Sequence, residues 1–441
     1  MPFALKFGRR PIYILSTALQ LGVSVWAAKI QTVADLMLIN AFNCFLGSLA
    51  EAIVQMTIAD LFFVQQRGVT TSIYVWVVVI AISLAPVAAG YITLDQGWRW
   101  VWIWVAILLG ICLVLFFFFY EETKYIRQIE GRPPTSIIDS NNAYTRPSKR
   151  NLIDQSEKKE LDDLSVKNGL THSQSARQPI QPTRKTYIQR LKLWSSSPGS
   201  FKALMYHTTQ PFFMMLTMPA VAYTALMYGI TTACYQITVT VISSYMVRPP
   251  YNFTSAEIGL ISGIPGFIGT TLSAPICGFL SDRIILWLAK KNRGVYEPEM
   301  RLWLMIAFGL FIPTGLLIFG YGLGQGKPWP MIAVGAGIYT FGMTPASSVV
   351  LAYATDAYTN IIADAMVGVV FARNVLATIF IFALTPWIDS VGIANVFLTL
   401  ALIAALFVLL SIVLLIYGKR LRAHTTARYE TWSGRQFDTR H

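Results

Sequence analysis

Long apolar runs separated by short polar connections make up most of the chain, and each run is long enough to cross a membrane. Such a run needs about 20 residues to span ~30 Å of hydrocarbon as a helix. The predicted transmembrane helices are residues 11–28, 34–56, 71–93, 98–120, 217–246, 256–280, 302–321, 329–352, 362–385 and 391–417. The pattern therefore predicts an all-α polytopic membrane protein with ten spans.

One long polar stretch, residues 121–205, divides these spans into four before it and six after it. It is rich in Lys, Arg, Ser, Asn and Pro and poor in large apolar residues, so we expect it to be mostly disordered. Within it, residues 183–194 place apolar positions at helical spacing among basic ones, which is typical of an amphipathic helix on a membrane surface. The predicted organisation is a transmembrane bundle of residues 1–120, this loop, a second bundle of residues 206–418 and a tail of residues 419–441.

Composition agrees with the membrane class and argues against several others. Of 441 residues, 54% are hydrophobic and 13% are charged, whereas a soluble domain has about 25% charged residues. The four cysteines lie far apart inside apolar runs without a CxxC pair, so we expect neither a metal site nor a cofactor. The sequence has no paired-carboxylate, metal-spacing or nucleophile-elbow pattern of an enzyme and no GxxxxGK[ST] motif of an ATP-driven pump.

The formal net charge of +13 falls mainly on one side of the predicted membrane. If the first turn is cytoplasmic, the other side receives few basic residues. These are Lys29, Arg99, Arg248 and Lys327. The positive-inside rule then places both termini in the cytoplasm, and the charge faces the lipid bilayer rather than nucleic acid. Asn252 opens the glycosylation sequon Asn-Phe-Thr in a loop that this orientation places outside.

Two halves of one motif stand at the ends of predicted spans. The motif is G-x-x-x-D-[RK]-x-G-[RK]-[RK]; its second half lies at the start of the chain and its first half follows the sixth span. The matching residues are Lys6, Gly8, Arg9 and Arg10 at the start, and Gly278, Asp282 and Arg283 after the sixth span. Met1 and Leu5 occupy the positions of the motif's first Gly and its Asp.

Both halves resemble the motif that transporters of the major facilitator superfamily carry between helices two and three and between helices eight and nine. Asp60 and Arg67 resemble the end of the family's fourth helix and the turn after it. Pro86 and Gly90 are kept from the G-P-x-x-G-G element of the fifth helix of antiporters. The proline and the small residues of this element permit a bend in the helix or close packing against a neighbour. The element has either a gating role or a role in packing alone.

Three shorter elements resemble fungal multidrug and metabolite exporters. They are GWRW at 97–100, YEET at 120–123 and EPEMR at 297–301. The resemblance implies a major facilitator fold of two helical bundles, in which the first span here matches the family's third helix. The N-terminal bundle is then incomplete, because two helices would normally come before it.

The resemblance also implies a function: a monomeric secondary transporter that exports a small organic molecule, such as a drug or metabolite, in exchange for protons across a fungal plasma membrane. In this fold, an Asp beside the N-terminal end of a neighbouring helix forms a latch that favours one bundle arrangement. The first latch lacks its acidic residue, because Leu5 stands at the position of the motif's Asp. The alternatives are an uptake or vacuolar transporter, or a truncated protein that transports nothing.

Few ionisable residues lie inside the predicted spans, and such residues are by default candidates for function. Glu51 lies within the second span and Arg373 near the middle of the ninth. Asn40, Asn43 and Glu51 share one helical face, which resembles the cavity-facing fourth helix of the family. Glu51 is the candidate proton carrier, because burial raises the pKa of a carboxyl group. A structural ion pair involving Arg373 and Asn374 is the alternative.

Polar residues at helical spacing also mark two spans of the second bundle. These are Thr232, Tyr235 and Gln236 in residues 217–246, and Tyr339 in residues 329–352. Polar stripes with aromatic residues suit an amphiphilic organic substrate. Bundle packing is an equally good explanation for each of them.

Overall fold

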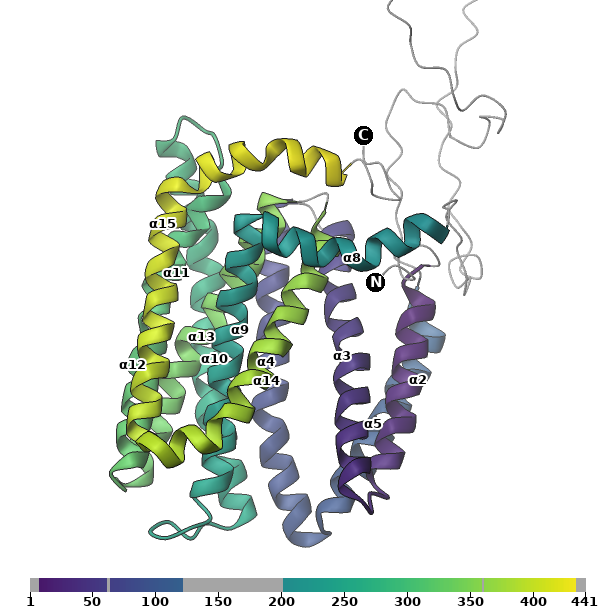
Figure 1. Ribbon diagram of the computed structural model, residues 1–441, viewed down its shortest axis with the longest axis vertical. Helices are drawn as coiled ribbons and strands as arrows, with labels where there is room; N and C mark the ends of the chain where they lie inside the picture. Colours follow the sequence, from purple (N-terminus) through teal and green to yellow (C-terminus); the bar gives the residue numbers. More distant parts are fainter. Residues whose placement is uncertain (1–7, 62–63, 122–200, 359–360, 434–441) are drawn as a thin grey trace, which may run out of the picture. The chain divides into compact units, whose positions relative to one another are not determined.

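The computed structural model describes residues 8–61, 64–121, 201–358 and 361–433, and within these ranges the chain is helical without strands (Figure 1). All of them belong to one compact unit. The elements are α2 (Arg10–Ala27), α3 (Val33–Leu61), α4 (Val64–Asp95), α5 (Trp98–Phe119), α8 (Phe201–Thr217), α9 (Pro219–Tyr245), α10 (Ser255–Lys291), η3 (Pro298–Arg301), α11 (Leu302–Gly309), α12 (Phe311–Gly324), α13 (Trp329–Ala357), α14 (Ile362–Val391) and α15 (Ile393–Ser433). The amphipathic helix expected at 183–194 lies outside the described residues.

Eight segments of the described chain are long and apolar enough to cross a membrane. They correspond to the last eight predicted spans, from α4 to α15, and each segment starts within a few residues of the predicted start. Helices α10 and α15 run well past the predicted ends, and α11 and α12 form one segment. The first two predicted spans are the helices α2 and α3, which are not among these eight. The all-α membrane fold is confirmed, and the total of ten spans stays a prediction.

The predicted span 302–321 is divided into α11 and α12 at Leu310. Pro313 explains the break, because proline has no amide hydrogen to donate to the carbonyl of Gly309, four residues earlier. Gly309 faces α15 there, and a Cβ on it would lie 2.8 Å from Val408. The helix is therefore interrupted where a small residue meets its neighbour.

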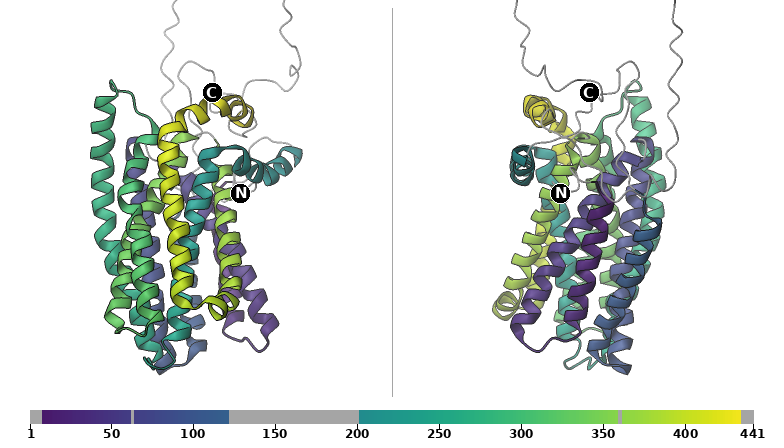
Figure 2. Two further views of the ribbon diagram at one scale, coloured as in Figure 1. Left: turned by 60° about the vertical axis from the view of Figure 1, so that its left-hand side comes forward. Right: turned by 90° about the vertical axis from the view of Figure 1, so that its right-hand side faces the viewer.

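Two helices occupy parts of the predicted loop and tail. Helix α8 begins at Phe201, inside the predicted loop, and lies at a steep angle to α9 (Figures 1 and 2). It packs on α14, where the rings of Phe212 and Phe371 meet edge to face at 4.8 Å. Helix α15 continues to Ser433 through the predicted tail, and its last part turns across the ends of the neighbouring helices (Figure 1).

The hydrophobic core of the described residues lies mainly among helices α9 to α15. Its main helix pairs are α9 with α14, α12 with α13, α10 with α13 and α12 with α15. Its largest fully buried side chains include Tyr339, Tyr353, Phe319 and Phe397. Helix α5, by contrast, has no buried residue in the described part of the chain. The second bundle is thus the better packed one.

The N-terminal helices pack as a smaller group. Helix α2 lies between α3 and α5, and α4 contacts α5. Tyr13 of α2 packs against Phe116 and Tyr120 at the end of α5, with ring centroids 5.9 and 5.2 Å away. The principal contact between the two groups of helices joins α4 to α10.

Candidate functional site

A cluster of polar side chains joins α9 and α14 inside two candidate membrane spans. Arg373 donates from Nη1 to the hydroxyl oxygen of Tyr228 at 3.2 Å, and its guanidinium lies 5.3 Å from the centre of the Tyr228 ring. It also donates from Nε and Nη2 to the Asn374 side-chain oxygen, at 3.3 and 3.0 Å. Arg373 is half-buried. The planar guanidinium is therefore held in one orientation by an aromatic ring and an amide.

Gly229 permits this close approach of the two helices. A Cβ on Gly229 would lie 2.6 Å from Leu376 and 3.3 Å from the Cα of Arg373. Tyr228, Thr232 and Gln236 recur every four residues and so share one face of α9. Thr232 is half-buried and Gln236 is exposed. Of the predicted residues, Thr232, Gln236, Arg373 and Asn374 thus lie on or beside this cluster.

Tyr235 and Tyr339 lie elsewhere in the bundle. Tyr339 is buried and its hydroxyl donates a hydrogen bond to the backbone carbonyl of Thr231, which ties α13 to α9. Tyr235 is buried too, near Ser83 of α4. In this structure both side chains take part in helix packing.

The predicted polar face of α3 is described only in part. Asn40 is exposed and Asn43 half-buried, while the side chain of Glu51 lies outside the described residues. Helix α3 contacts α14, the helix that carries Arg373. The roles proposed for Asn40, Asn43 and Glu51 stay predictions.

Helices α4 and α10 meet along a contact made largely by glycine, which we call the α4–α10 seam. A Cβ on Gly90 would lie 2.6 Å from the carbonyl oxygen of Ser255, and one on Gly259 would lie 2.5 Å from that of Pro86. At Gly263 the nearest atom, the carbonyl oxygen of Ser83, would be only 2.3 Å away. The close packing expected at Pro86 and Gly90 is present, and the glycines of α10 are its counterpart.

The described part of the motif at the start of the chain contacts α5, and its gating role stays a prediction. Gly8 has a positive φ of 99°, and Arg9 and Arg10 are both buried. Arg10 donates from Nη2 to the carbonyl oxygen of Phe117 at 2.5 Å, in the last turn of α5. A cation at the C-terminal end of a helix is stabilised by the helix dipole. Arg10 therefore holds α2 against the end of α5.

The second motif and the end of α3 are described less fully. A Cβ on Gly278 would meet no described atom within 4 Å, so the close helix approach expected there is not seen in the described part of the chain. Arg283 is exposed with its guanidinium 4.0 Å from the centre of the Phe279 ring. The side chains of Asp282, Asp60 and Arg67 lie outside the described residues.

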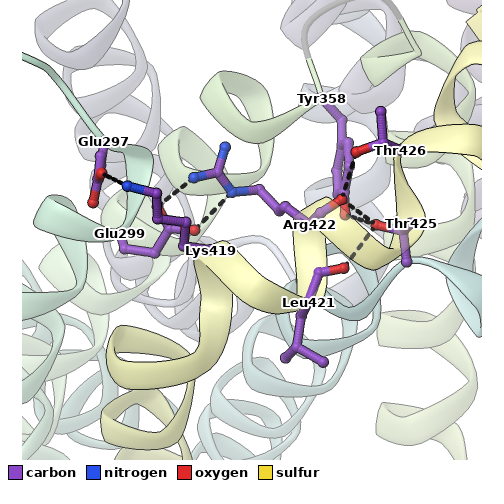
Figure 3. A network of polar contacts seen from close by, with 8 residues as sticks. All are labelled: Glu297, Glu299, Tyr358, Lys419, Leu421, Arg422, Thr425 and Thr426. Carbon is purple, nitrogen blue, oxygen red and sulfur yellow. Dashed lines mark hydrogen bonds and ion pairs between the residues drawn. The ribbon is translucent and has the colours of Figure 1, made fainter.

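A set of ion pairs joins the turn before α11 to the final part of α15, which we call the η3–α15 network (Figure 3). Arg422 donates from Nε and Nη2 to the two carboxylate oxygens of Glu299, both at 2.7 Å. Lys419 binds Glu297 at 2.6 Å. Thr425 lies 3.4 Å from the hydroxyl of Tyr358, whose ring packs 5.7 Å from that of Tyr429. These contacts fasten the end of α15 across the end of α13.

A buried ion pair extends this network toward α13. Arg301 donates from Nε to Asp356 at 2.7 Å, and their side chains are 7% and 2% exposed. The hydroxyl of Tyr296 donates to the same carboxylate. Burial and the charge of Asp356 raise the pKa of Tyr296, so its hydroxyl stays protonated and remains a donor. The sequence showed only the EPEMR element and a basic tail, without indicating that they meet.

No group of three or more His, Cys, Asp or Glu residues that could hold a metal occurs among the described residues. Asn252 is exposed in the connection between α9 and α10, in a left-handed backbone conformation with φ 51°. Its glycosylation stays a prediction.

Comparison with known proteins decides the family. The family model described as Major Facilitator Superfamily matches residues 1–358. The chain belongs to this superfamily. It is 32% identical to an MFS-type transporter of Schizosaccharomyces pombe, over 98% of this chain and 76% of that one.

Two further similarities add to this assignment. The protein "Probable drug/proton antiporter YHK8" of Saccharomyces cerevisiae is 28% identical over 54% of this chain and 46% of its own length. The crystal structure of the human organic anion transporter MFSD10 superposes with a TM-score of 0.53 at 14% identity, over 92% of this chain and 77% of that one. At that identity the structural likeness shows the fold alone. The protein is an integral multi-pass transporter of the major facilitator family, as its apolar helices and sequence relatives agree.

Proposed function

We propose that the protein exports a small organic molecule in exchange for protons, with Arg373 in the substrate site. The Arg373–Tyr228–Asn374 cluster carries the proposal. Arginine inside a membrane span costs free energy and is retained mainly where it serves a pathway or a ligand. Here it sits half-buried and orientated by two side chains, on the helix pair that also carries Thr232.

Export by exchange is supported by two independent features. Pro86 and Gly90 of the antiporter element form part of the tight α4–α10 seam between the two groups of helices. A relative in yeast bears the name of a drug/proton antiporter. The proposed path runs between the two groups of helices, and the seam would close it where Gly90 meets Ser255.

Glu51 is the proposed proton carrier. It lies on α3, the helix in contact with α14, so proton and substrate sites would stand on neighbouring helices. Glu51 would take up a proton from one side of the membrane and release it to the other. Both steps would then be linked to binding of the substrate at Arg373. The proposed setting is the plasma membrane, with both termini in the cytoplasm and the protein acting as a monomer.

The test uses purified protein in liposomes that contain a pH-sensitive dye. A panel of organic compounds is added without a gradient, and coupled exchange is read as a compound-dependent change of internal pH. We expect Arg373→Ala to abolish the response and Arg373→Lys to restore part of it. Arg248→Ala, in an exposed loop, is the matched control.

Glu51→Gln separates coupling from binding. We expect this variant to bind the active compound while no longer moving protons. If protons move in the same direction as the compound, the protein is a proton-coupled uptake transporter and the proposal of export by exchange is wrong. A wild-type protein that moves neither protons nor any compound would overturn the transport proposal.

A further inference from the structure

An apolar groove runs along the outside of α10 and α13, away from the polar cluster and the seam; we call it the lateral groove. One part of it has a volume of about 610 Å³ and a second part, bordered by α12, about 340 Å³. Ile268, Val334 and Gly337 line both parts, so the two are continuous. All three helices belong to candidate membrane spans. Hydrocarbon chains of the bilayer therefore meet this groove directly.

The groove follows one stripe of α10. Leu260, Ile264, Ile268 and Leu272 are four residues apart and line it in turn. The glycines that touch α4, such as Gly263, lie on a different face of the same helix. At 1.5 Å per residue the stripe is about 18 Å long, more than half of the ~30 Å hydrocarbon thickness. It matches an extended acyl chain of one leaflet.

One end of the groove is charged. Glu257 is the single charged residue among those lining either part, and it stands beside Trp329 and Phe253. Its Oε2 accepts hydrogen bonds from the backbone and the hydroxyl of Thr254, at 2.8 and 2.9 Å. Within the described residues its Oε1 takes part in no hydrogen bond, so this oxygen can receive a donor from a ligand.

We infer that the lateral groove binds a phospholipid with a primary amine, one acyl chain lying in the groove and the ammonium donating to Glu257. An ammonium group carries three donors, whereas a trimethylammonium group carries none. Phosphatidylethanolamine and phosphatidylcholine share a phosphate and a net charge of zero but differ in this respect. The site should therefore prefer phosphatidylethanolamine.

The experiment measures bound lipid directly and requires neither substrate nor gradient, so it can fail independently of the proposed function. Full-length protein is placed in nanodiscs with equal amounts of the two lipids, identical in their acyl chains. The lipids that stay bound are counted by native mass spectrometry. A charge-assisted hydrogen bond predicts about a tenfold enrichment of phosphatidylethanolamine.

Two substitutions test the two halves of the site. Glu257→Gln removes the charge and keeps the helix start, because glutamine also completes a capping box; we expect the enrichment to disappear. Ala333→Phe fills the groove and should lower the count of both lipids several-fold. Ala383→Phe, an exposed alanine on α14, is the matched control and should change neither.

Three results would overturn the inference. The first is equal retention of both lipids by the wild type. The second is an enrichment that survives Glu257→Gln. The third is displacement of the lipid by added dodecylamine at low concentration, which would assign the groove to a free amphiphile.

Discussion

The α4–α10 seam and the η3–α15 network hold helices together by opposite means. In the seam, glycines pack against backbone carbonyls, and a Cβ on Gly263 would lie only 2.3 Å from the carbonyl oxygen of Ser83, so no side chain fits there. The network consists of charged pairs, and Arg301 with Asp356 is buried almost completely. The seam joins two groups of helices, whereas the network lies wholly within the second one.

This difference follows from what each contact has to do. Separating a buried ion pair leaves uncompensated charge and costs about 3–5 kcal/mol. Contacts between small residues rely on dispersion attraction. Each pair of atoms contributes only about 0.1–0.2 kcal/mol, so this attraction is lost in small steps as the helices move apart. In the proposed transport cycle the seam opens and the network moves as one body. The ion pairs therefore join helices that stay together in the proposed cycle, whereas the glycine contacts join helices that separate.

The largest effect is expected from Asp356→Ala. It leaves Arg301 buried without its carboxylate and should lower the free energy of unfolding by about 3–5 kcal/mol, measured as a fall in the unfolding temperature of purified protein. The double variant Asp356→Ala with Arg301→Met removes both charges and should recover most of the loss. An unchanged unfolding temperature in the single variant would show that this pair does not hold the second bundle together.

Gly263→Ala should act on transport. Its Cβ meets a backbone oxygen that cannot turn aside, so the seam must widen, at a cost of about 1–3 kcal/mol in the closed arrangement. Transport in liposomes should fall about tenfold, since each 1.4 kcal/mol is a factor of ten. Gly22→Ala on α2, where a Cβ would meet no described atom within 4 Å, is the control. Equal activity of the two variants would contradict the role of the seam.

Glu299→Gln weakens the bidentate bond to Arg422. Hydrogen bonds to charged groups contribute about 1.5–3 kcal/mol when buried. Because the Arg422 side chain is 26% exposed, we expect the lower end of that range. The final part of α15 should loosen, which limited trypsin digestion at Arg428 would detect as faster cleavage. Glu297→Gln is the comparison and should leave the cleavage rate close to that of the wild type.

The smallest effect is expected at Glu297 and Lys419, a pair near the surface worth about 0.2–1 kcal/mol. Lys419 lowers the pKa of Glu297. The pair therefore contributes its full stabilisation at pH values above the ordinary pKa of Glu, about 4.3. This stabilisation is lost as the pH falls through the lower pKa of Glu297 in the folded state. Unfolding temperatures measured against pH should show this loss in the wild type and not in Lys419→Met. A loss that resists added salt would contradict a surface pair.

The helices themselves could be predicted because a membrane span needs a long apolar run. The predicted 329–352 lies within α13 and the predicted 217–246 covers α9, since side chains there face lipid or another helix. Pro86 and Gly90 were recognisable from their resemblance to an antiporter element. Their partners Gly259 and Gly263 carried no separate signal, because glycine is common in transmembrane helices.

The partners of charged groups could not be predicted. Arg422 lies 123 residues after Glu299, and nothing in a basic tail says which acid it meets. Tyr228 was missed for a similar reason, since one tyrosine in an apolar run is ordinary. Its position four residues before Thr232, on the same face, was the available signal, and it gains meaning only once α14 places Arg373 beside it.

The pairing of Glu299 with Arg422 also sets an order of events during synthesis. The ribosome adds about 5–20 residues per second, so Glu299 exists on the order of ten seconds before its partner. Until then a carboxylate destined for burial lacks the guanidinium that it binds in the finished structure. A nascent chain that stops before Arg422 would therefore keep the Glu299 carboxylate without its partner.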